Sequence, residues 1–253
     1  MKEKLKIAVL IDSENAEKSI IEEMFAEISK YGKPTIKRAY GDWSKENLKG
    51  WKSVINDYAI KAVQKFAHTK GKNSTDTALI IDALDILHSR KVDGFCIISS
   101  DSDYTGLALR IREEGLFVMG IGKLQTPKSL VNACEVFVYT EILKSNLKPE
   151  KNIIKGPKII GKINLEDIEN KLTKKKINSD LIDKAFDNIC DESDCVFASR
   201  FKEAIISLDP SFDHRVYGFS SFRKFLEALS PRYKIKIHED GTTISICRDE
   251  TEI

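Results

Sequence analysis

The first 143 residues alternate between apolar runs and segments with helical spacing, and this rhythm restricts the possible folds more than any other feature. Six runs are predicted to be strands: KIAVLID, PTIKRAYGD, AVQKFAHT, GFCIISS, FVMGIG and VFVYT. Between them lie helical segments such as SIIEEMFAEISKYG and TDTALIIDALDILHSRK, the second with a possible N-cap at Thr75. Strands that alternate with helices favour a parallel sheet covered by helices on both faces. The pattern therefore predicts an α/β domain over residues 1–143.

Residues 144–178 interrupt this rhythm and are predicted to form a basic linker. The stretch contains two prolines, two glycines and 10 lysines against 4 acidic residues. Its last part, INLEDIENKLTKKK, also fits a short helix. Residues 1–143 have a net charge of +1 and residues 179–253 one of −5, so the positive charge of the chain is concentrated in this stretch.

Residues 179–253 predict a second, smaller α+β domain. DLIDKAFDNIC, FASRFKEAIISL and GFSSFRKFLEAL have the spacing of amphipathic helices, and YKIKIHEDGTTISICR fits two strands around an EDG turn. Three helices followed by a hairpin are the layout of a winged helix.

The cysteines and the apolar runs bear on where the protein works. The 5 cysteines are irregularly spaced and form no metal-binding pattern, so we expect reduced thiols in a cytoplasmic protein. No apolar run is long enough for a transmembrane helix, and the start of the chain lacks the long apolar segment and cleavage site of a signal peptide.

Acidic residues in the first domain stand where strands end or helices begin. Asp12 ends the first strand, Asp42 follows the second, Asp76 opens the long helix, and Asp101 and Asp103 follow the fourth strand. The carboxyl ends of parallel strands lie at one edge of a sheet, so we expect these acids to converge. Crowded carboxylates repel one another unless a cation such as Mg²⁺ or Mn²⁺ lies among them. Such a cation could orient a water molecule and stabilise the charge that develops on a phosphodiester.

Three of these acids also have an ordinary structural interpretation, whereas Asp12 ends a strand expected at the centre of the sheet and is harder to explain in this way. Asp103 fits a helix N-cap, Asp76 fits the first turn of a helix, and Asp42 fits a turn. Asp82 lies in a helical segment that is apolar almost all round and needs a partner, either in support of the site or in a purely structural role. Asn15 fits either a contact to a ligand water or a cap of the next helix.

Four stretches together resemble a known family. VLIDSEN, RAYGDW, KNSTDTALIIDAL and ISSDSDYTGLALRIREEG, in this order, are similar to the NYN domain of the PIN-like nuclease superfamily. The resemblance covers about residues 1–143 and implies a PIN-like, Rossmann-like parallel sheet with a metal-dependent endoribonuclease site. The family's main acids fall on Asp12, Asp76, Asp101 and Asp103; Asn15, Asp42 and Ser100 match supporting positions.

The C-terminal unit resembles a LOTUS (OST-HTH) domain, a winged-helix module associated with RNA binding and RNA–protein assembly. The match rests on Phe212, Tyr217, Gly218, Phe219, Phe222, Phe225 and Leu226. Phe222, Phe225 and Leu226 have the i, i+3, i+4 spacing that favours a core role over base stacking. Gly218 is predicted to supply a tight turn.

Basic residues give this half of the chain its candidate RNA contacts. They are Lys174, Lys175 and Lys176 in the linker and Arg215, Arg223, Lys224, Arg232, Lys234 and Lys236 beyond it. Lysines attract phosphates irrespective of base sequence. A charge run also fits a solvated surface, and the acidic balance of residues 179–253 also fits a protein partner.

We therefore expect a Mg²⁺- or Mn²⁺-dependent endoribonuclease with an appended RNA-recognition module. The alternative is a non-catalytic adaptor that binds RNA or protein. A phosphohydrolase of the haloacid-dehalogenase type also begins with a strand ending in Asp, but it needs a second Asp where this chain has Glu14. Glu14 is then a solvated loop acid. The PKSLVNA helix and the VFVYT edge strand fit a homodimer interface without requiring one.

Overall fold

The computed structural model of the protein describes residues 4–65, 74–145, 176–190 and 195–249. The chain divides into two compact units, Met1–Asn146 and Leu147–Ile253, which are described separately below. None of the described helices is both long and apolar enough to cross a membrane.

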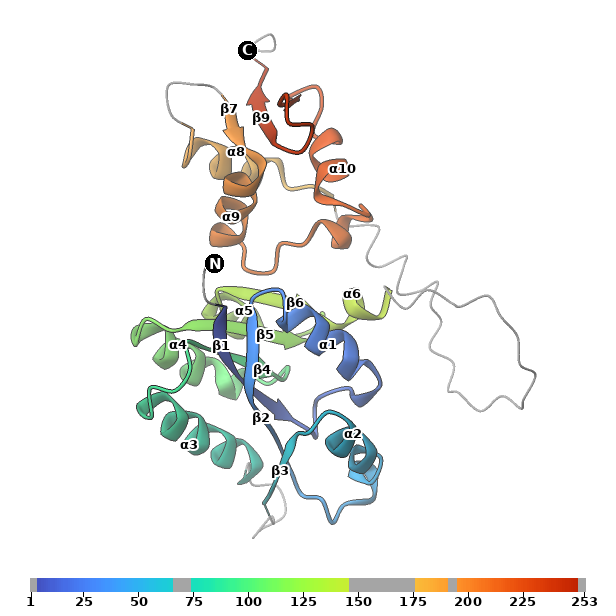
Figure 1. Cartoon of the computed structure of the whole chain (residues 1–253), viewed down its shortest axis with the longest axis vertical. Helices are drawn as coiled ribbons and strands as arrows, with labels where there is room; N and C mark the ends of the chain where they lie inside the picture. The colour runs from blue at the N-terminus through green and yellow to red at the C-terminus, as the bar shows by residue number, and fades with distance from the viewer. Residues whose placement is uncertain (1–3, 66–73, 146–175, 191–194, 250–253) are drawn as a thin grey trace, which may run out of the picture. The chain divides into compact units, whose positions relative to one another are not determined.

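The first unit is an alternation of strands and helices (Figure 1). Its strands are β1 (Leu5–Asp12), β2 (Gly32–Gly41), β3 (Lys61–Gln64), β4 (Gly94–Ile98), β5 (Phe117–Gly122) and β6 (Val136–Tyr139). Its α-helices are α1 (Ile21–Ile28), α2 (Trp51–Asp57), α3 (Ser74–His88), α4 (Thr105–Glu113), α5 (Lys128–Ala133) and α6 (Thr140–Ser145). Short 3-10 turns are η1 (Lys18–Ile20), η2 (Glu46–Leu48) and η3 (Ser102–Tyr104).

The six strands form one parallel sheet in the order β3-β2-β1-β4-β5-β6. Helices cover both faces: α3 and α4 lie on one side of the sheet, and α1, α2 and α6 lie on the other (Figure 1). This confirms the predicted α/β fold with a sheet between helical layers. The strand order reverses between β1 and β4, and in sheets of this kind a crevice opens at such a point beyond the carboxyl ends of the strands.

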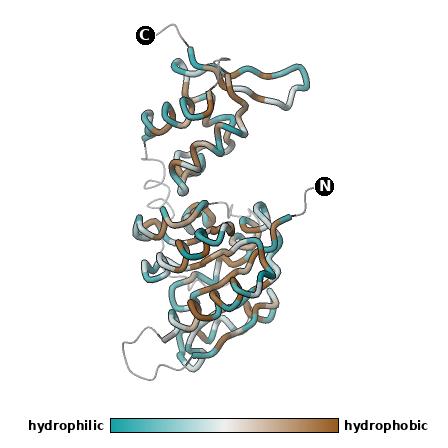
Figure 2. The backbone as a smooth tube through the Cα atoms, turned by 90° about the vertical axis from the view of Figure 1, so that its left-hand side faces the viewer, coloured by the Kyte–Doolittle hydropathy of each residue, from teal (hydrophilic) through white to brown (hydrophobic). Residues whose placement is uncertain are grey.

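The core explains why the strand runs are continuously apolar. Residues Ile7–Ile11 of β1 have no exposed surface, since β1 has neighbours on both edges and helices on both faces. Hydrophobic stretches run through the interior of this unit in Figure 2. From α3, Leu79 and Ala83 pack on the sheet beside Leu107 and Ile111 of α4. A strand buried on both faces has no need of polar alternation.

Two predicted elements differ in extent from the observed ones. The long helix begins at Ser74, one residue before the predicted N-cap Thr75. The predicted third strand AVQKFAHT is β3 at Lys61–Gln64, and its second half, residues 66–69, lies outside the described residues.

The second unit has the elements of a small winged helix (Figure 1). They are α8 (Ser179–Asp187), β7 (Cys195–Phe197), α9 (Ala198–Leu208), the 3-10 turn η4 (His214–Tyr217), α10 (Phe222–Glu227), β8 (Tyr233–Ile237) and β9 (Ile244–Arg248). β8 and β9 form the predicted antiparallel hairpin, and β7 joins them as a third strand that the sequence pattern did not predict.

The core of this unit contains the aromatic residues that the helical spacing assigned to it. Phe225 and Leu226 are fully buried, and Phe222 is partly buried, stacked on Phe225 with ring centroids 5.8 Å apart. Gly218 has a φ of 83° and ends η4, so the predicted glycine turn is present.

The prediction that all cysteines are reduced thiols is wrong for one pair. Cys195 on β7 and Cys247 on β9 are register partners and form a disulfide. Cys96, Cys134 and Cys190 are not part of this disulfide. The sequence separation of 52 residues hid this pair, because only the pairing of β7 with β9 brings the two thiols together.

Candidate active site

The predicted acids come from the elements that meet at the carboxyl edge of the sheet, at the reversal between β1 and β4. Ile11 is the register partner of Ile98, so Asp12 on β1 lies beside Ser99 at the end of β4. The chain then continues from Ser99 into Asp101 and Asp103. The parallel register thus places residues 12 and 99–103 side by side although they are far apart in sequence.

Three carboxylates form a tight group at this edge. Oxygen atoms of Asp76, Asp101 and Asp103 all lie within 4.8 Å of one another. Asp76 stands in the first turn of α3, and Asp101 and Asp103 stand at the start of η3. Asp101 accepts a hydrogen bond from the backbone N–H of Asp103 at 3.0 Å, which fixes this loop. Asp101 is thus both a cap and a member of the acidic group.

Asp12 lies beside this group and is almost completely buried, with 1% of its surface exposed. Its Oδ2 accepts hydrogen bonds from Asn15 Nδ2 at 2.7 Å and from Ser99 Oγ at 2.8 Å. Burial raises the pKa of Asp12, and the charge of Asp76 raises it further, against the lowering effect of the two hydrogen bonds. Asn15 and Ser99 therefore support a carboxylate that the protein interior disfavours.

Asp76 is fixed by a hydrogen bond from a buried tyrosine. The hydroxyl of Tyr104, which is fully buried, donates to Asp76 Oδ1 at 2.6 Å. Burial raises the pKa of Asp76, and the hydrogen bond from Tyr104 lowers it. The charges of Asp101 and Asp103 raise the pKa of Asp76 as well. Crowding of like charges is therefore a property of this site and not only of its sequence pattern.

Two other predicted acids are engaged elsewhere. Asp42 accepts hydrogen bonds from Ser44 Oγ at 2.6 Å and Gln64 Nε2 at 3.0 Å, and these bonds lower its pKa. Asp82 pairs with Arg38 and accepts the hydroxyl of Tyr40, both from β2. Asp42 thus organises its own turn, and Asp82 ties α3 to the sheet.

Several contributors to the site were not expected from the sequence. Glu14 was interpreted as a solvated loop acid, but it pairs with Lys45 at 2.6 Å and its charge raises the pKa of Asp76. Ser99 and Tyr104 lie within the stretch ISSDSDYTGLALRIREEG, but the resemblance of that stretch assigned no role to either residue. The sequence signal for these two residues is their position after β4, because the pairing of β1 with β4 places the end of β4 beside Asp12.

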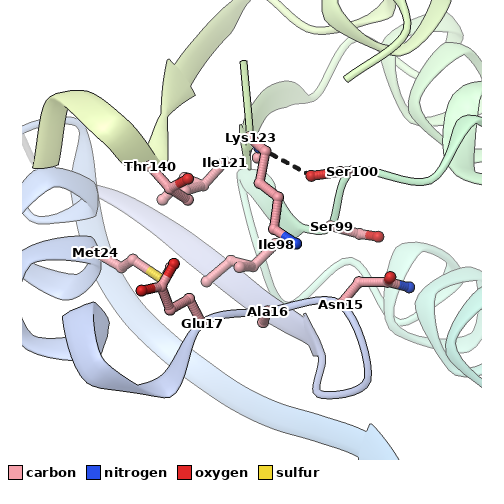
Figure 3. A pocket seen from close by; sticks show the side chains of 11 residues that line it. Asn15, Ala16, Glu17, Met24, Ile98, Ser99, Ser100, Ile121, Lys123 and Thr140 are labelled. Carbon is pink, nitrogen blue, oxygen red and sulfur yellow. Dashed lines mark hydrogen bonds between the residues drawn. The ribbon is translucent and has the colours of Figure 1, made fainter. Parts of the chain in front are cut away.

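A small cavity lies where β4 and β5 end, beside the segment that follows β1 (Figure 3). Asn15, Ser99 and Ser100 line it together with Lys123, which follows the end of β5. The backbone N–H of Lys123 donates to Ser100 Oγ at 2.9 Å, and its side chain extends into the cavity on the side of Ser99. Ser100, predicted as a supporting residue, therefore links the loop after β4 to the residue that follows β5.

The predicted RNA contacts of the second unit differ in their surroundings. Arg215 donates to Asp213 from Nε at 2.9 Å and from Nη2 at 2.5 Å, so this guanidinium is occupied within its own turn. Arg223 pairs with Glu227 at 3.0 Å and Lys234 with Asp249 at 2.6 Å. Three further candidates, Lys176, Lys224 and Lys236, are exposed, whereas Lys174 and Lys175 lie outside the described residues.

Two family models match this chain, one over each unit. The sequence model of the NYN domain matches residues 6–143, and that of the OST-HTH/LOTUS domain matches residues 163–245. The second match begins inside the predicted linker. Among solved structures, a protein of unknown function from Vibrio parahaemolyticus is similar at 18% identity and a TM-score of 0.47, over 55% of this chain and 95% of that one. No curated protein matches the chain.

Nuclease and RNA-binding functions follow from these two domain families. The NYN match spans more than half of the sequence. This protein therefore belongs to the NYN domain family and carries an OST-HTH/LOTUS domain after its NYN domain.

Proposed function

We propose that the protein is a metal-dependent endoribonuclease that hydrolyses phosphodiester bonds of RNA, with Mg²⁺ or Mn²⁺ as its cofactor. The observation that carries this proposal is the group of three carboxylates, Asp76, Asp101 and Asp103, with oxygen atoms within 4.8 Å of one another. The group lies in the NYN domain, at the sheet edge where sites form in folds of this kind.

The donor set fits a hard divalent cation. Mg²⁺ and similar ions take carboxylate oxygens and water, commonly with one or two carboxylates and phosphate oxygens of the substrate. Burial and like charges raise the pKa of Asp76, and burial also raises that of Asp12. A cation would relieve this repulsion, since it stabilises the charged form of each acid.

We assign the residues as follows. Asp76, Asp101 and Asp103 would hold the cation, and Asp12 would be a fourth acid next to it. Asn15 and Ser99 keep Asp12 in place by hydrogen bonds, and Ser100 holds the loop after β4 through Lys123. When bound, the cation would lower the pKa of a water molecule and stabilise negative charge on the phosphate.

A cleavage assay on labelled single-stranded and structured RNA tests this proposal. Wild-type protein should cleave in Mg²⁺ or Mn²⁺ and lose activity in EDTA. Asp101→Asn should lower the rate by about 100-fold or more, since even residues that only support a metal ligand contribute 10- to 100-fold. Asp85→Asn is the matched control, because Asp85 is exposed on the same domain. A rate that withstands EDTA or Asp101→Asn would reject the mechanism.

The alternative is a non-catalytic adaptor that keeps the nuclease fold and binds RNA or protein. The same assay separates the two functions. An adaptor would retain RNA affinity without cleavage in any divalent metal. The combination of an NYN and an OST-HTH/LOTUS domain supports RNA as the partner in either case.

Recruitment of RNA by the basic stretch is a separate part of the proposal. Alanine at Lys174, Lys175 and Lys176 should flatten the dependence of RNA affinity on salt, by up to about 2 in the slope of log K against log salt. An unchanged slope would remove this stretch from the RNA path. Of the contacts predicted beyond the linker, Lys224 and Lys236 are exposed, and Arg215 is occupied by Asp213.

Location and assembly complete the proposal. We propose the cytoplasm as the compartment, because the proposed substrate is RNA. The Cys195–Cys247 disulfide argues in the other direction, since disulfides persist in oxidising compartments. Fractionation of cells that express the tagged chain tests this. A homodimer would use β6, which is an edge strand of the sheet, and a protein partner would use the second unit. Sedimentation at several concentrations tests the dimer.

A further inference from the structure

A second hollow lies beside α2 and the edge strand β3, apart from the cavity next to the acids. It has a volume of about 520 Å³, within the range of small-molecule and cofactor sites. Its apolar lining is formed by Trp43, Leu48, Ile55 and Ala62. The proposed catalytic residues do not line it.

Trp43 is fixed as one wall of this hollow. Its backbone N–H donates to Gln64 Oε1 at 3.0 Å, and its indole Nε1–H donates to the carbonyl oxygen of Val63 at 3.1 Å. The side chain is nevertheless half-buried, in contrast to Trp51, of which 2% is exposed. An indole whose N–H is already bonded and whose ring still reaches the surface is a preorganised platform for another flat ring.

The polar lining of the hollow suits a nucleotide better than a purely apolar ligand. Lys49, Lys52 and Asn56 complete it, and all three are exposed. Lys49 pairs with Glu46 at 2.6 Å, but both side chains are largely exposed and such a pair contributes little. Lysines attract phosphates, and a side-chain amide can bond the polar edge of an unpaired base.

The hollow is close to the acidic edge. Trp43 follows Asp42 at the carboxyl end of β2, which is the direct neighbour of β1. A methyl group at Gly41 would lie 3.6 Å from Ser13 Cβ and 3.7 Å from Trp43 Cη2, so Gly41 separates the ring from the residue after Asp12. β3 is two strand spacings from β1, about 10 Å.

We propose that this hollow binds a nucleobase of single-stranded RNA, stacked on Trp43, on the side of the domain where β2 leads to the acidic edge. Lys52 and Lys49 would contact the adjoining phosphates, and Asn56 would contact the edge of the base. The inference rests on the proposed function only in that RNA is the ligand; the binding itself requires no catalysis.

Fluorescence of the full chain in EDTA tests the site directly. The protein has 2 tryptophans, so Trp51→Phe leaves Trp43 as the sole reporter. A short oligoadenylate should quench this signal by stacking. A strand of the same length with abasic spacers in place of the bases should not. Absence of quenching at saturating oligoadenylate would overturn the inference, whatever else in the chain binds RNA.

Affinity measurements give the second readout. Trp43→Ala should weaken binding of oligoadenylate by about 5- to 150-fold, the range for loss of one stacked base, and leave the abasic strand unaffected. Trp43→Phe should restore most of the affinity, and Lys52→Ala should weaken both strands equally. Equal affinity of Trp43→Ala and wild type for oligoadenylate would contradict the site. So would equal losses for both strands in a variant that melts like the wild type.

The two proposals fail in different ways. Normal metal-dependent cleavage without base-dependent quenching would remove this site and leave the nuclease standing. Base-dependent quenching without cleavage in any metal would remove the nuclease and leave this site standing.

Discussion

At the scale of one residue, Asp76 illustrates how the acidic site lowers the free energy of unfolding of the protein. Its pKa in the folded chain is raised above 3.8 by burial and by neighbouring acids. Between 3.8 and the raised value, the folded state binds more protons than the unfolded state. The free energy of unfolding therefore falls as the pH rises through this window and stays lowered above it. Asp12 contributes in the same direction.

A stabilising substitution follows for the metal-free protein. At pH 7 in EDTA, Asp76→Asn should raise the free energy of unfolding by about 1 kcal/mol, since it removes a partly buried charge beside other acids. The advantage should shrink as the pH is lowered toward 4 and reverse when Mg²⁺ is added. Thermal melts across pH check this, with Asp85→Asn as the control. A variant less stable than the wild type at pH 7 without metal would show that repulsion is not the dominant effect.

Tyr104 makes a second prediction at the residue scale. Its hydroxyl donates to Asp76 at 2.6 Å and lowers the pKa of that carboxyl. Tyr104→Phe should therefore weaken Mn²⁺ binding by about 10-fold, which is the lower range for loss of a group that positions a metal ligand. Calorimetric titration with Mn²⁺ measures this independently of cleavage. Tyr58→Phe is the control, because the hydroxyl of Tyr58 contacts Glu22. Equal Mn²⁺ affinity in Tyr104→Phe and wild type would assign the hydroxyl a structural role only.

The elements of the sheet are held by close packing at β5. A Cβ atom at Gly120 would lie 2.4 Å from Phe137 Cδ2 and 2.9 Å from Cys134 Sγ, so β5 can approach β6 and α5 only with glycine at this position. Gly120→Ala should destabilise the first unit by about 1–3 kcal/mol through overpacking. At Gly106 in α4 nothing lies within 4 Å of a new Cβ atom. Gly106→Ala should be neutral or stabilising by up to about 1 kcal/mol. Urea unfolding of the two variants checks the contrast, and similar midpoints would contradict it.

Most elements of the first unit follow from sequence periodicity, whereas β7 does not. The three residues of β7 run directly into the amphipathic helix α9, and a segment so short has no period of its own. Its strand character comes from pairing with β9 alone. The reversal of strand order between β1 and β4 likewise depends on which edges pair, and no local pattern specifies that.

At the scale of the whole molecule, the disulfide predicts that the two units respond differently to reductant. A crosslink that spans 52 residues contributes about 4 kcal/mol by restricting the unfolded chain. Reduction, or replacement of Cys195 and Cys247 by serine, should lower the melting temperature of the second unit and leave that of the first unchanged. Calorimetry with and without reductant checks this. Thiol titration of the unreduced, unfolded chain should find three reactive thiols, those of Cys96, Cys134 and Cys190. Five reactive thiols would contradict the disulfide.

The sequence by itself determined the parallel α/β sheet, the winged-helix layout of the second unit and the edge at which the acids collect. It could do so because burial on both faces imposes continuous apolar runs, and parallel strands present their carboxyl ends together. Tertiary structure alone decided which acids converge. Asp76 joins Asp101 and Asp103, whereas Asp82 turns to Arg38 and Tyr40, and Asp42 to Ser44 and Gln64. Strand register and helix docking set these partners. They bring together residues that are far apart in sequence, such as Asp12 and Ser99, and no local spacing encodes that proximity.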